Sequence, residues 1–506
     1  MVCYKIACFC IRLTILFSKV DKNTNSVILY YNEGTGVMIK FGTGGWRAVI
    51  GDEFVKENIQ KVGQGVAELA KEADCKTPII IGYDRRFLSA EAAKWLAEVL
   101  TANGFQVLFM NRSVPTPLVM HTVKKQELDF GLEVTASHNP SEYNGIKLII
   151  KEGRDASVEI TDRLETLISE VKEVKALAFA EALSNGKITY IKNPFNDFLD
   201  DIMSVIDMDA IREKGPRILF DPMHGSGTYP LMVLLYTSRC TLDVININKD
   251  AYFGGHMPAP SKQGLVKLTE MVVKEGYDLG IAVDGDGDRL GIIDSNGQYV
   301  DANDILCMLY YYLHVYKGWR GPAVRNLATT HMLDAIAHDL GEECYEVPVG
   351  FKYISAKINE TDAILGGESS GGLTVRGHIN GKDSIYAATL FVEMLCKTGM
   401  TATEMIDMLH EKYGNYEMVE SNVRFEPSYK AVITKIVFED KQLPNFEGRE
   451  IDRVSYEDGC KIYFKDGGFI ICRFSGTEPL LRIFAESDTK EKAEKTVKEF
   501  SEFLGL

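Results

Sequence analysis

Short apolar runs that end in polar, glycine-containing loops recur along the chain. Residues 79–81 lead into Gly82 and Asp84, residues 130–134 into a Ser/Asn/Pro stretch, and residues 279–283 into an acidic stretch. Strands of this kind alternate with helical segments, which predicts a mostly parallel sheet with helices on both faces. Ligands of such sheets bind at the carboxyl ends of the strands, so we expect the functional site in these loops.

The same pattern returns further along. Residues 217–220 precede a loop that contains Asp221 and His224, and residues 363–365 lead into Gly367. The recurrence predicts three similar α/β units in tandem. Beyond a part in shaping their loop, we assign no role to Asp221 or His224.

Composition limits the classes of partner. The chain has 506 residues, which is too long for one hydrophobic core. Its net charge of −16 disfavours nucleic acid and anionic membranes as partners. The ten cysteines show no metal-binding spacing and are typical of reduced thiols, so we predict a cytoplasmic protein. No apolar run approaches the roughly 20 residues of a membrane span.

Residues 1–37 differ from the rest. An apolar stretch broken by Lys5 and Arg12 is followed by polar residues and no small-residue cleavage site, which argues against a secretory signal. We interpret the segment as an N-terminal extension outside the fold, with Met38 as the true start. A short interfacial anchor is the alternative.

Ser137 lies in the sequence Val-Thr-Ala-Ser-His-Asn-Pro of residues 134–140, directly after an apolar run. Asn144-Gly145 follows and is a strong hairpin signal. We expect Ser137 on a tight loop with its hydroxyl exposed. A serine nucleophile needs a base, a metal or a positive site, which His138 and Lys147 are near enough to supply. The alternative is a simple polar turn.

Asp284, Asp286 and Asp288 alternate with glycines after the run 279–283. Three converging carboxylates suit a hard divalent cation. The pattern begins like a calcium-binding EF-hand loop, but Ser295 stands where the twelfth-position glutamate is required. Magnesium beside a phosphate fits better, and an acidic turn without metal is the alternative.

Together with Gly-Glu-Ser-Ser-Gly at 367–371 and Arg-Phe-Ser-Gly-Thr-Glu-Pro at 473–479, these two loops resemble the four motifs of the alpha-D-phosphohexomutase superfamily, the phosphoglucomutases and phosphomannomutases. The resemblance covers residues 38–506. It implies an α/β fold of three tandem similar α/β domains with mixed, mostly parallel sheets, plus a smaller C-terminal α+β domain. The implied segments are an extension at 1–37, a phosphoserine domain at 38–192, a metal-binding domain at 193–303, a sugar-binding domain at 304–414 and a phosphate-binding domain at 415–506.

The resemblance also implies the catalytic residues. Ser137 would be the phosphoserine, and one of its oxygens would join Asp284, Asp286 and Asp288 in holding Mg²⁺. Lys147 would be the general base or acid, with His138 supporting the serine loop. Arg47 and Arg289 would face the phosphoserine. For Lys147 the alternative is a surface lysine, and for the two arginines it is a structural ion pair.

The substrate residues follow in the same way. Glu368 and Ser370 would bind adjacent ring hydroxyls, and Lys352 would contact substrate unless it simply faces solvent. Some relatives carry histidine directly after the sugar loop; Gly372 stands there, and His378 is our candidate replacement. Arg473, Ser475, Gly476 and Thr477 would hold the phosphate that is not being transferred.

The resemblance therefore implies a phosphohexomutase, an isomerase that interconverts hexose 1-phosphate and hexose 6-phosphate, of glucose and/or mannose, with glucose 1,6-bisphosphate or the matching hexose bisphosphate as activator. Phosphoglucosamine mutase and phosphopentomutase are alternatives within the superfamily. From other classes we keep a phosphosugar hydrolase and a phosphosugar-binding protein. The expected partner is a small phosphosugar, and we make no prediction of the oligomeric state.

Overall fold

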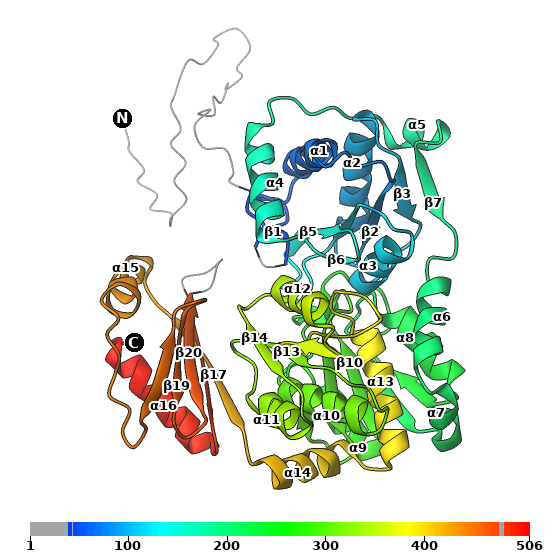
Figure 1. Cartoon of the computed structure of the whole chain (residues 1–506). Coiled ribbons are helices and arrows are strands. Elements are labelled where there is room, and N and C mark those ends of the chain that lie inside the picture. Colours follow the sequence, from blue (N-terminus) through cyan, green and yellow to red (C-terminus); the bar gives the residue numbers. More distant parts are fainter. Residues whose placement is uncertain (1–38, 43, 475–479) are drawn as a thin grey trace, which may run out of the picture. The chain divides into compact units, whose positions relative to one another are not determined.

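A computed structural model of the chain describes residues 39–42, 44–474 and 480–506, and these residues form four sheets with their own helices (Figure 1). The predicted extension at 1–37 lies outside the described residues. Among the described helices, none combines the length and the apolar character that crossing a bilayer requires.

The first sheet has the strand order β1-β5-β4-β2-β3-β7, with β6 paired to β5. The pairs among β4, β2, β3 and β7 are parallel, whereas β5 runs antiparallel to both β4 and β1. The strands are β1 (Trp46–Val49), β2 (Ile79–Tyr83), β3 (Val107–Met110), β4 (Phe130–Val134), β5 (Tyr143–Ile150), β6 (Arg154–Asp155) and β7 (Ile188–Ile191).

Small residues let the helices of this domain pack closely. Gly63 and Gly65 lie in α1, and a β-carbon on either would press into side chains of α2 or α4. Helix α2 packs on β2, β3 and β4, and α3 packs on β2, β4 and β5. The helices are α1 (Lys56–Glu72), α2 (Ser89–Ala102), α3 (Thr116–Lys125), α4 (Val158–Glu170) and α5 (Phe179–Ser184).

The second sheet has the order β12-β11-β10-β8-β9, with β10, β8 and β9 parallel and β11 antiparallel to β10. Its strands are β8 (Arg217–Asp221), β9 (Thr241–Val244), β10 (Leu279–Val283), β11 (Leu290–Asp294) and β12 (Tyr299–Val300). The helices of this region are α6 (Asn196–Val205), α7 (Met208–Lys214), α8 (Thr228–Thr237), η1 (Phe253–Gly255) and α9 (Val266–Glu275).

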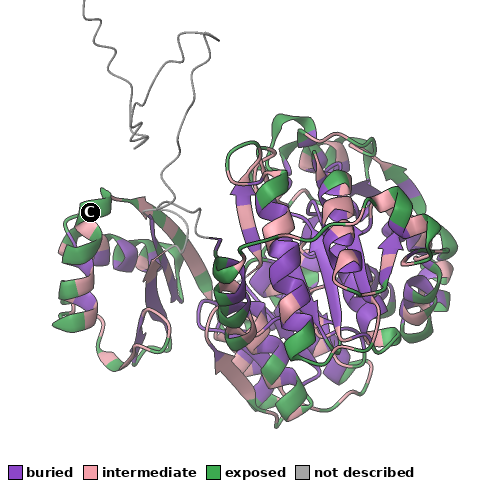
Figure 2. Ribbon diagram, turned by 90° about the horizontal axis from the view of Figure 1, so that it is seen from above, coloured by how far each residue is buried: buried purple, intermediate pink, exposed green. Residues whose placement is uncertain are grey.

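The third sheet has the order β14-β13-β15-β16, with β16 antiparallel to β15. Its elements are β13 (Ala323–Asn326), β14 (Cys344–Val347), β15 (Leu365–Gly367), β16 (Leu373–Val375), α10 (Ala302–Val315), α11 (Met332–Asp339), α12 (Phe351–Thr361), α13 (Ser384–Thr398) and α14 (Ala402–Tyr413). One hydrophobic cluster includes Ile80, Ile218 and Ala323, so the core continues through the first three sheets. Figure 2 marks the buried residues along the ribbon.

The fourth sheet is antiparallel throughout, in the order β17-β21-β20-β19-β18, and has a separate core around Ile470 and Phe500. Its elements are β17 (Glu417–Arg424), η2 (Pro427–Tyr429), α15 (Lys430–Ile433), η3 (Thr434–Glu439), β18 (Ile451–Ser455), β19 (Cys460–Phe464), β20 (Phe469–Phe474), β21 (Leu480–Ser487) and α16 (Lys490–Phe503). The predicted fold class, three α/β domains and a smaller C-terminal domain, is confirmed. The predicted boundaries between them stay a prediction.

Candidate active site

Three strands bring the predicted loops together. Strand β4 ends before Ser137, β10 ends before Asp284, and β15 ends in the loop of Glu368. The backbone N–H of Leu290 donates to the carbonyl of Gly371, so the acidic loop of residues 284–289 is held next to the loop of residues 368–372.

Ser137 is fully buried, so the expectation of an exposed hydroxyl was wrong. Its Oγ lies 3.1 Å from Oδ2 of Asp284 and 3.3 Å from Nδ1 of His138. The acidic loop covers the serine, and a β-carbon on Gly285 would come within 2.8 Å of the Ser137 carbonyl oxygen. The hydroxyl therefore faces the carboxylates rather than bulk solvent.

Asn144-Gly145 is not a hairpin turn, because both residues lie inside β5. Gly145 pairs with Arg47 of β1, and a β-carbon there would come within 2.2 Å of the Trp46 carbonyl oxygen. The glycine is thus explained by a close approach of two strands, a use of this residue that sequence alone does not distinguish from a turn.

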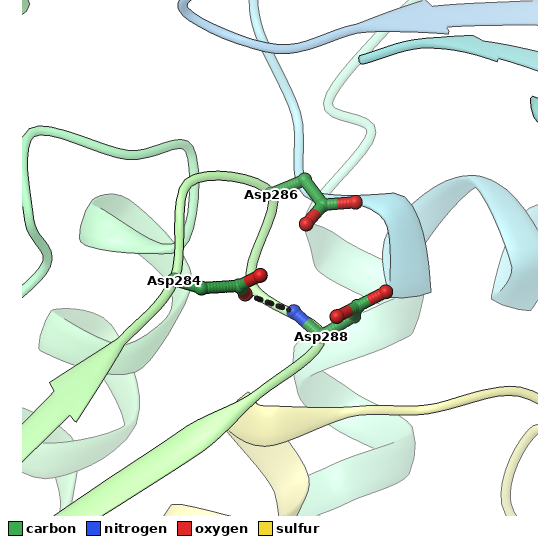
Figure 3. Close-up of side chains that lie close together, drawn as sticks. All are labelled: Asp284, Asp286 and Asp288. Carbon is green, nitrogen blue, oxygen red and sulfur yellow. Dashed lines mark hydrogen bonds between the residues drawn. The ribbon is translucent and has the colours of Figure 1, made fainter. Parts of the chain in front are cut away.

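The three aspartates form one buried cluster. A carboxylate oxygen of each lies within 4.8 Å of the others, and Figure 3 shows the side chains gathered around the loop. Oδ1 of Asp284 accepts the backbone N–H of Asp288 at 2.8 Å and that of Arg289 at 3.0 Å, which fixes the curl of the loop.

Positive side chains surround the cluster. Lys147 Nζ lies 2.7 Å from Oδ2 of Asp286 and 2.9 Å from Oδ2 of Asp288. Lys382 Nζ lies 2.9 Å from the same oxygen of Asp288, and Arg289 is 3.9 Å from its other oxygen.

These charges and burial shift the pKa values of Asp284 and Asp288 in opposite directions. Burial and the two neighbouring carboxylates raise the pKa of Asp284 well above its usual value. Burial would do the same for Asp288, but Lys147, Lys382 and Arg289 hold its pKa well below normal. Burial opposes the charge of Lys147 as well, yet Asp286 and Asp288 raise its pKa above that of a free lysine.

The donor set fits a divalent cation. Oδ1 of Asp286 and Oδ1 of Asp288 are buried and have no hydrogen-bond partner among the described residues. Buried carboxylate oxygens are costly when unpartnered, and they are the ligands that Mg²⁺ prefers. Asp284, Asp286 and Asp288, together with an oxygen on Ser137, are therefore the residues that would hold it.

His138 and Arg47 border the serine. Burial, together with Arg289 and Arg47, lowers the pKa of His138 well below its usual value, which favours the neutral imidazole. Arg47 Nη1 donates to Oδ1 of Asn139 at 2.5 Å, which ties β1 to the serine loop.

Glu368 lies at the end of β15 with both carboxylate oxygens bonded. Oε1 accepts from Asn326 Nδ2 at 3.1 Å, and Oε2 is 3.4 Å from Ser370 Oγ. Lys352, near the start of α12, lies with its Nζ 5.4 Å from the ring centre of Tyr353. These contacts leave the predicted sugar-binding roles untested.

His378 is buried among aromatic side chains and next to Asp383. Its Nε2 lies 2.6 Å from Oδ2 of Asp383, and its ring stacks on Tyr386 at 4.7 Å between centres. The structure thus gives His378 a packing environment, and its predicted contact with substrate stays a prediction.

Arg473 is at the end of β20 and is paired with Asp458. Its Nη2 lies 2.9 Å and 2.8 Å from the two carboxylate oxygens, while Nε has no partner among the described residues. The predicted phosphate ligands Ser475, Gly476 and Thr477 lie outside the described residues.

Two residues that contact the aspartates were not predicted from the sequence. Thr116 Oγ1 donates to Oδ2 of Asp286 at 2.6 Å, and Lys382 contacts Asp288 as described above. Neither lies in a recognisable pattern of residues, so only the fold reveals them. Asp221 accepts the backbone N–H of Met223 within its own loop, whereas His224 contacts the carbonyl of Asn248 in the loop that follows β9.

Four family descriptions match the chain in order. They are phosphoglucomutase/phosphomannomutase alpha/beta/alpha domain I at residues 38–175, domain II at 196–297, domain III at 301–413, and the C-terminal domain at 422–503.

Known proteins are similar over nearly the whole chain. A Phosphoglucomutase/phosphomannomutase from Thermococcus kodakarensis is 30% identical over 459 residues, which are 90% of this chain and 95% of that protein. A Phosphoglucosamine/phosphogalactosamine mutase from Sulfurisphaera tokodaii is 27% identical, over 92% of this chain and 98% of that one.

Among solved structures, a Phosphoglucomutase/phosphomannomutase family protein from Burkholderia thailandensis superposes with a TM-score of 0.76 at 21% identity, covering 92% of this chain and 96% of that one. The fold is thus shared even where sequence identity is low. The chain belongs to the phosphoglucomutase/phosphomannomutase family of the alpha-D-phosphohexomutase superfamily, whose enzymes are isomerases.

Proposed function

We propose that the chain interconverts the 1-phosphate and 6-phosphate of a hexose, glucose and/or mannose, through a phosphoserine at Ser137 and a bisphosphorylated sugar. The observation that carries this proposal is the contact between the buried Ser137 hydroxyl and Asp284, inside a cluster of three carboxylates and next to His138. A serine that merely stabilised a turn would not require this concentration of charge.

Each half of the reaction transfers one phosphoryl group. The bond between phosphorus and Ser137 Oγ breaks, and a bond from phosphorus to a free hydroxyl of the sugar monophosphate forms. The bisphosphate then turns over in the site, and the other phosphate returns to Ser137. A hexose bisphosphate added from outside would phosphorylate Ser137 directly and so act as activator.

The chain's own groups prepare this transfer. Lys147 is our general acid or base for the proton exchanged between serine and sugar oxygens, and its ammonium also balances Asp286 and Asp288. Arg47 and Arg289 add positive charge beside the serine loop, where phosphoryl charge must be stabilised. A bound Mg²⁺ would supply further stabilisation of that charge at the three aspartates.

Binding of the sugar is assigned to the remaining motif residues. Glu368 and Ser370 would bond two adjacent ring hydroxyls, as an acceptor and as a donor or acceptor. Lys352 and His378 are further candidates for substrate contact. Arg473 can clamp the non-transferred phosphate bidentately, with Ser475, Gly476 and Thr477 completing an anion site.

The names of similar proteins support glucosamine phosphate as a second substrate class. Several similar proteins, at 26–31% identity, carry the name phosphoglucosamine mutase or probable phosphoglucosamine mutase. Glucosamine phosphate differs from glucose phosphate in one ring substituent, so the same site chemistry would serve it. Phosphopentomutase activity is the more distant alternative.

A kinetic panel tests both substrate classes. The protein is assayed with the 1-phosphates of glucose, mannose, glucosamine and ribose, each with magnesium and a trace of the matching bisphosphate. The proposal expects the highest kcat/KM with glucose or mannose and formation of the 6-phosphate. Release of free phosphate would instead indicate a hydrolase, and neither product would indicate a phosphosugar-binding protein.

A further inference from the structure

The backbone of Ser137 is held by side chains rather than by other backbone groups. Its N–H donates to Oγ1 of Thr135 at 2.8 Å, and its carbonyl oxygen accepts from Nη2 of Arg86 at 2.6 Å. Ser137 has a φ of 51°, in the left-handed region that a non-glycine residue adopts at a cost. A residue keeps such a conformation only where its surroundings enforce it.

Arg86 holds the whole serine loop through one guanidinium. Besides the carbonyl of Ser137, Nη2 bonds the carbonyl of Asn139 at 2.5 Å, and Nη1 bonds those of Pro140 at 2.7 Å and Tyr143 at 3.0 Å. The residue is 2% exposed. The rigid fork of a guanidinium suits this bridging of several acceptors, whereas the single ammonium of a lysine does not.

Asp84 connects the two groups that hold Ser137. Its Oδ2 accepts from Thr135 Oγ1 at 2.7 Å and lies 3.4 Å from Arg86 Nε. Its Oδ1 accepts the Ser89 hydroxyl at 2.6 Å and the Arg86 backbone N–H at 2.9 Å. Asp84 is 1% exposed and so gives the arginine a buried counter-charge.

These residues come from a different strand than the serine. Asp84 and Arg86 follow β2, which runs parallel to β4 with Tyr83 opposite Val134. The loop after β2 therefore lies beside the loop that carries Ser137. The guanidinium of Arg86 also lies over the ring of Phe253, 4.8 Å from its centre.

We propose that Arg86, Asp84 and Thr135 are positioning residues for phosphoryl transfer, which hold the strained backbone of Ser137 so that its oxygen meets Asp284. The inference rests on the proposed phosphoserine role of Ser137. The three residues act through Ser137 and need not contact the sugar. Loss of the network should therefore lower the rate of transfer far more than it changes the KM of the sugar phosphate.

Thr135 offers the cleanest test, because its hydroxyl can be removed without a change of shape. Wild type, Thr135→Val and Thr135→Ser are phosphorylated with glucose 1,6-bisphosphate, and transfer from Ser137 to glucose 1-phosphate is followed in a single turnover. We expect Thr135→Val to transfer about 100-fold more slowly, since small misplacements of reacting atoms cost rates of this order. Thr135→Ser keeps the hydroxyl and should stay within about threefold of wild type.

Arg86→Lys tests the guanidinium, with Arg325→Lys as its control. Arg325 is likewise buried and ion-paired, to Asp334 and Glu346, but lies on β13 and does not contact the serine loop. Both variants should lose thermal stability. Only Arg86→Lys should also slow transfer from Ser137, by about 100-fold or more in protein that is still folded by circular dichroism.

The outcomes separate this inference from the proposed function. Wild type that neither carries phosphate on Ser137 nor transfers it would overturn the proposed function and this inference with it. Wild type that transfers normally, with Thr135→Val equal to Thr135→Ser, would overturn the positioning role alone. The positioning role is likewise overturned if Arg325→Lys slows transfer as much as Arg86→Lys, because the effect would then be one of general stability.

Discussion

The hydroxyl of Ser137 lies 3.1 Å from Oδ2 of Asp284, although 147 positions separate the two residues in the chain. One residue follows β4 of the first sheet and the other follows β10 of the second. The contact places the proposed nucleophile beside three carboxylates, and this relationship is the basis of the predictions below.

The cluster of Asp284, Asp286 and Asp288 should be essential for activity. Asp286→Asn replaces one carboxylate oxygen by an amide nitrogen and removes the negative charge, so it is expected to lower kcat by about 100- to 1000-fold, as removal of a key electrostatic group does. EDTA should abolish activity in wild type, and magnesium should restore it. Asp243→Asn, on β9 of the same domain, is the control and should be active. Full activity of wild type in EDTA would contradict the metal assignment.

Glu368 should govern affinity for the sugar. Glu368→Gln keeps the shape but loses the negative charge, so we expect KM for the preferred hexose phosphate to rise about tenfold or more, while Ser137 still accepts a phosphate at saturating bisphosphate. Steady-state kinetics and intact mass measure the two effects. Glu360→Gln, in α12 and paired to Lys357, should leave both unchanged. A normal KM in Glu368→Gln would remove the residue from the sugar site.

Arg473 should grip the phosphate that is not transferred. Arg473→Ala is expected to raise KM for sugar monophosphates about tenfold or more and also to lower kcat, because a misplaced substrate reacts poorly. Arg453→Ala, an exposed arginine on β18 of the same domain, is the control. Kinetics of Arg473→Ala that match those of Arg453→Ala would show that the phosphate binds elsewhere.

Glu486 should make stability depend on pH. Burial raises the pKa of this carboxyl on β21 to about 7, only partly offset by bonds from Thr330 and His331. The native state then keeps a proton that the unfolded state releases near pH 4.5, so the stability contributed by the proton falls as pH rises from about 4.5 to 7.

A matched variant isolates that contribution. Glu486→Gln imitates the protonated acid and cannot ionise. Its stability relative to wild type should increase by up to roughly 3 kcal/mol between pH 5 and pH 8, as measured by urea denaturation. An unchanged difference between the two proteins across this pH range would mean that Glu486 is already charged in the native state.

Sequence patterns were sufficient to predict the position of a loop where its chemically active residues lie in one short stretch. The loops of Ser137 and Asp284 were predicted at the ends of strands, and the structure has them there. The burial of Ser137 was not predictable, because the residue that covers it, Gly285, belongs to another domain. The glycine of Asn144-Gly145 serves a close strand contact, and its dipeptide is the same as that of a turn.

Residues that contact the site from distant parts of the chain could not be predicted from the sequence, for a related reason. Thr116 and Lys382 meet the aspartates from α3 and from the segment after β16, and neither has a distinctive neighbour in the chain. Asp84 was visible as a polar residue after β2, but the carbonyls that its neighbour Arg86 binds lie 51–57 positions away from Arg86. Such contacts follow from strand order, which a residue pattern does not specify.

The most direct measurement follows one phosphate on Ser137. Wild type is phosphorylated with labelled hexose bisphosphate, and the label is located by peptide mass spectrometry. Unlabelled glucose 1-phosphate is then added in a rapid-mixing experiment. The account predicts a label on Ser137 alone, its passage to the sugar at least as fast as steady-state turnover, and no turnover in Ser137→Ala that still folds. Label that stays on the protein during turnover, or a Ser137→Ala variant as active as wild type, would contradict the central claim.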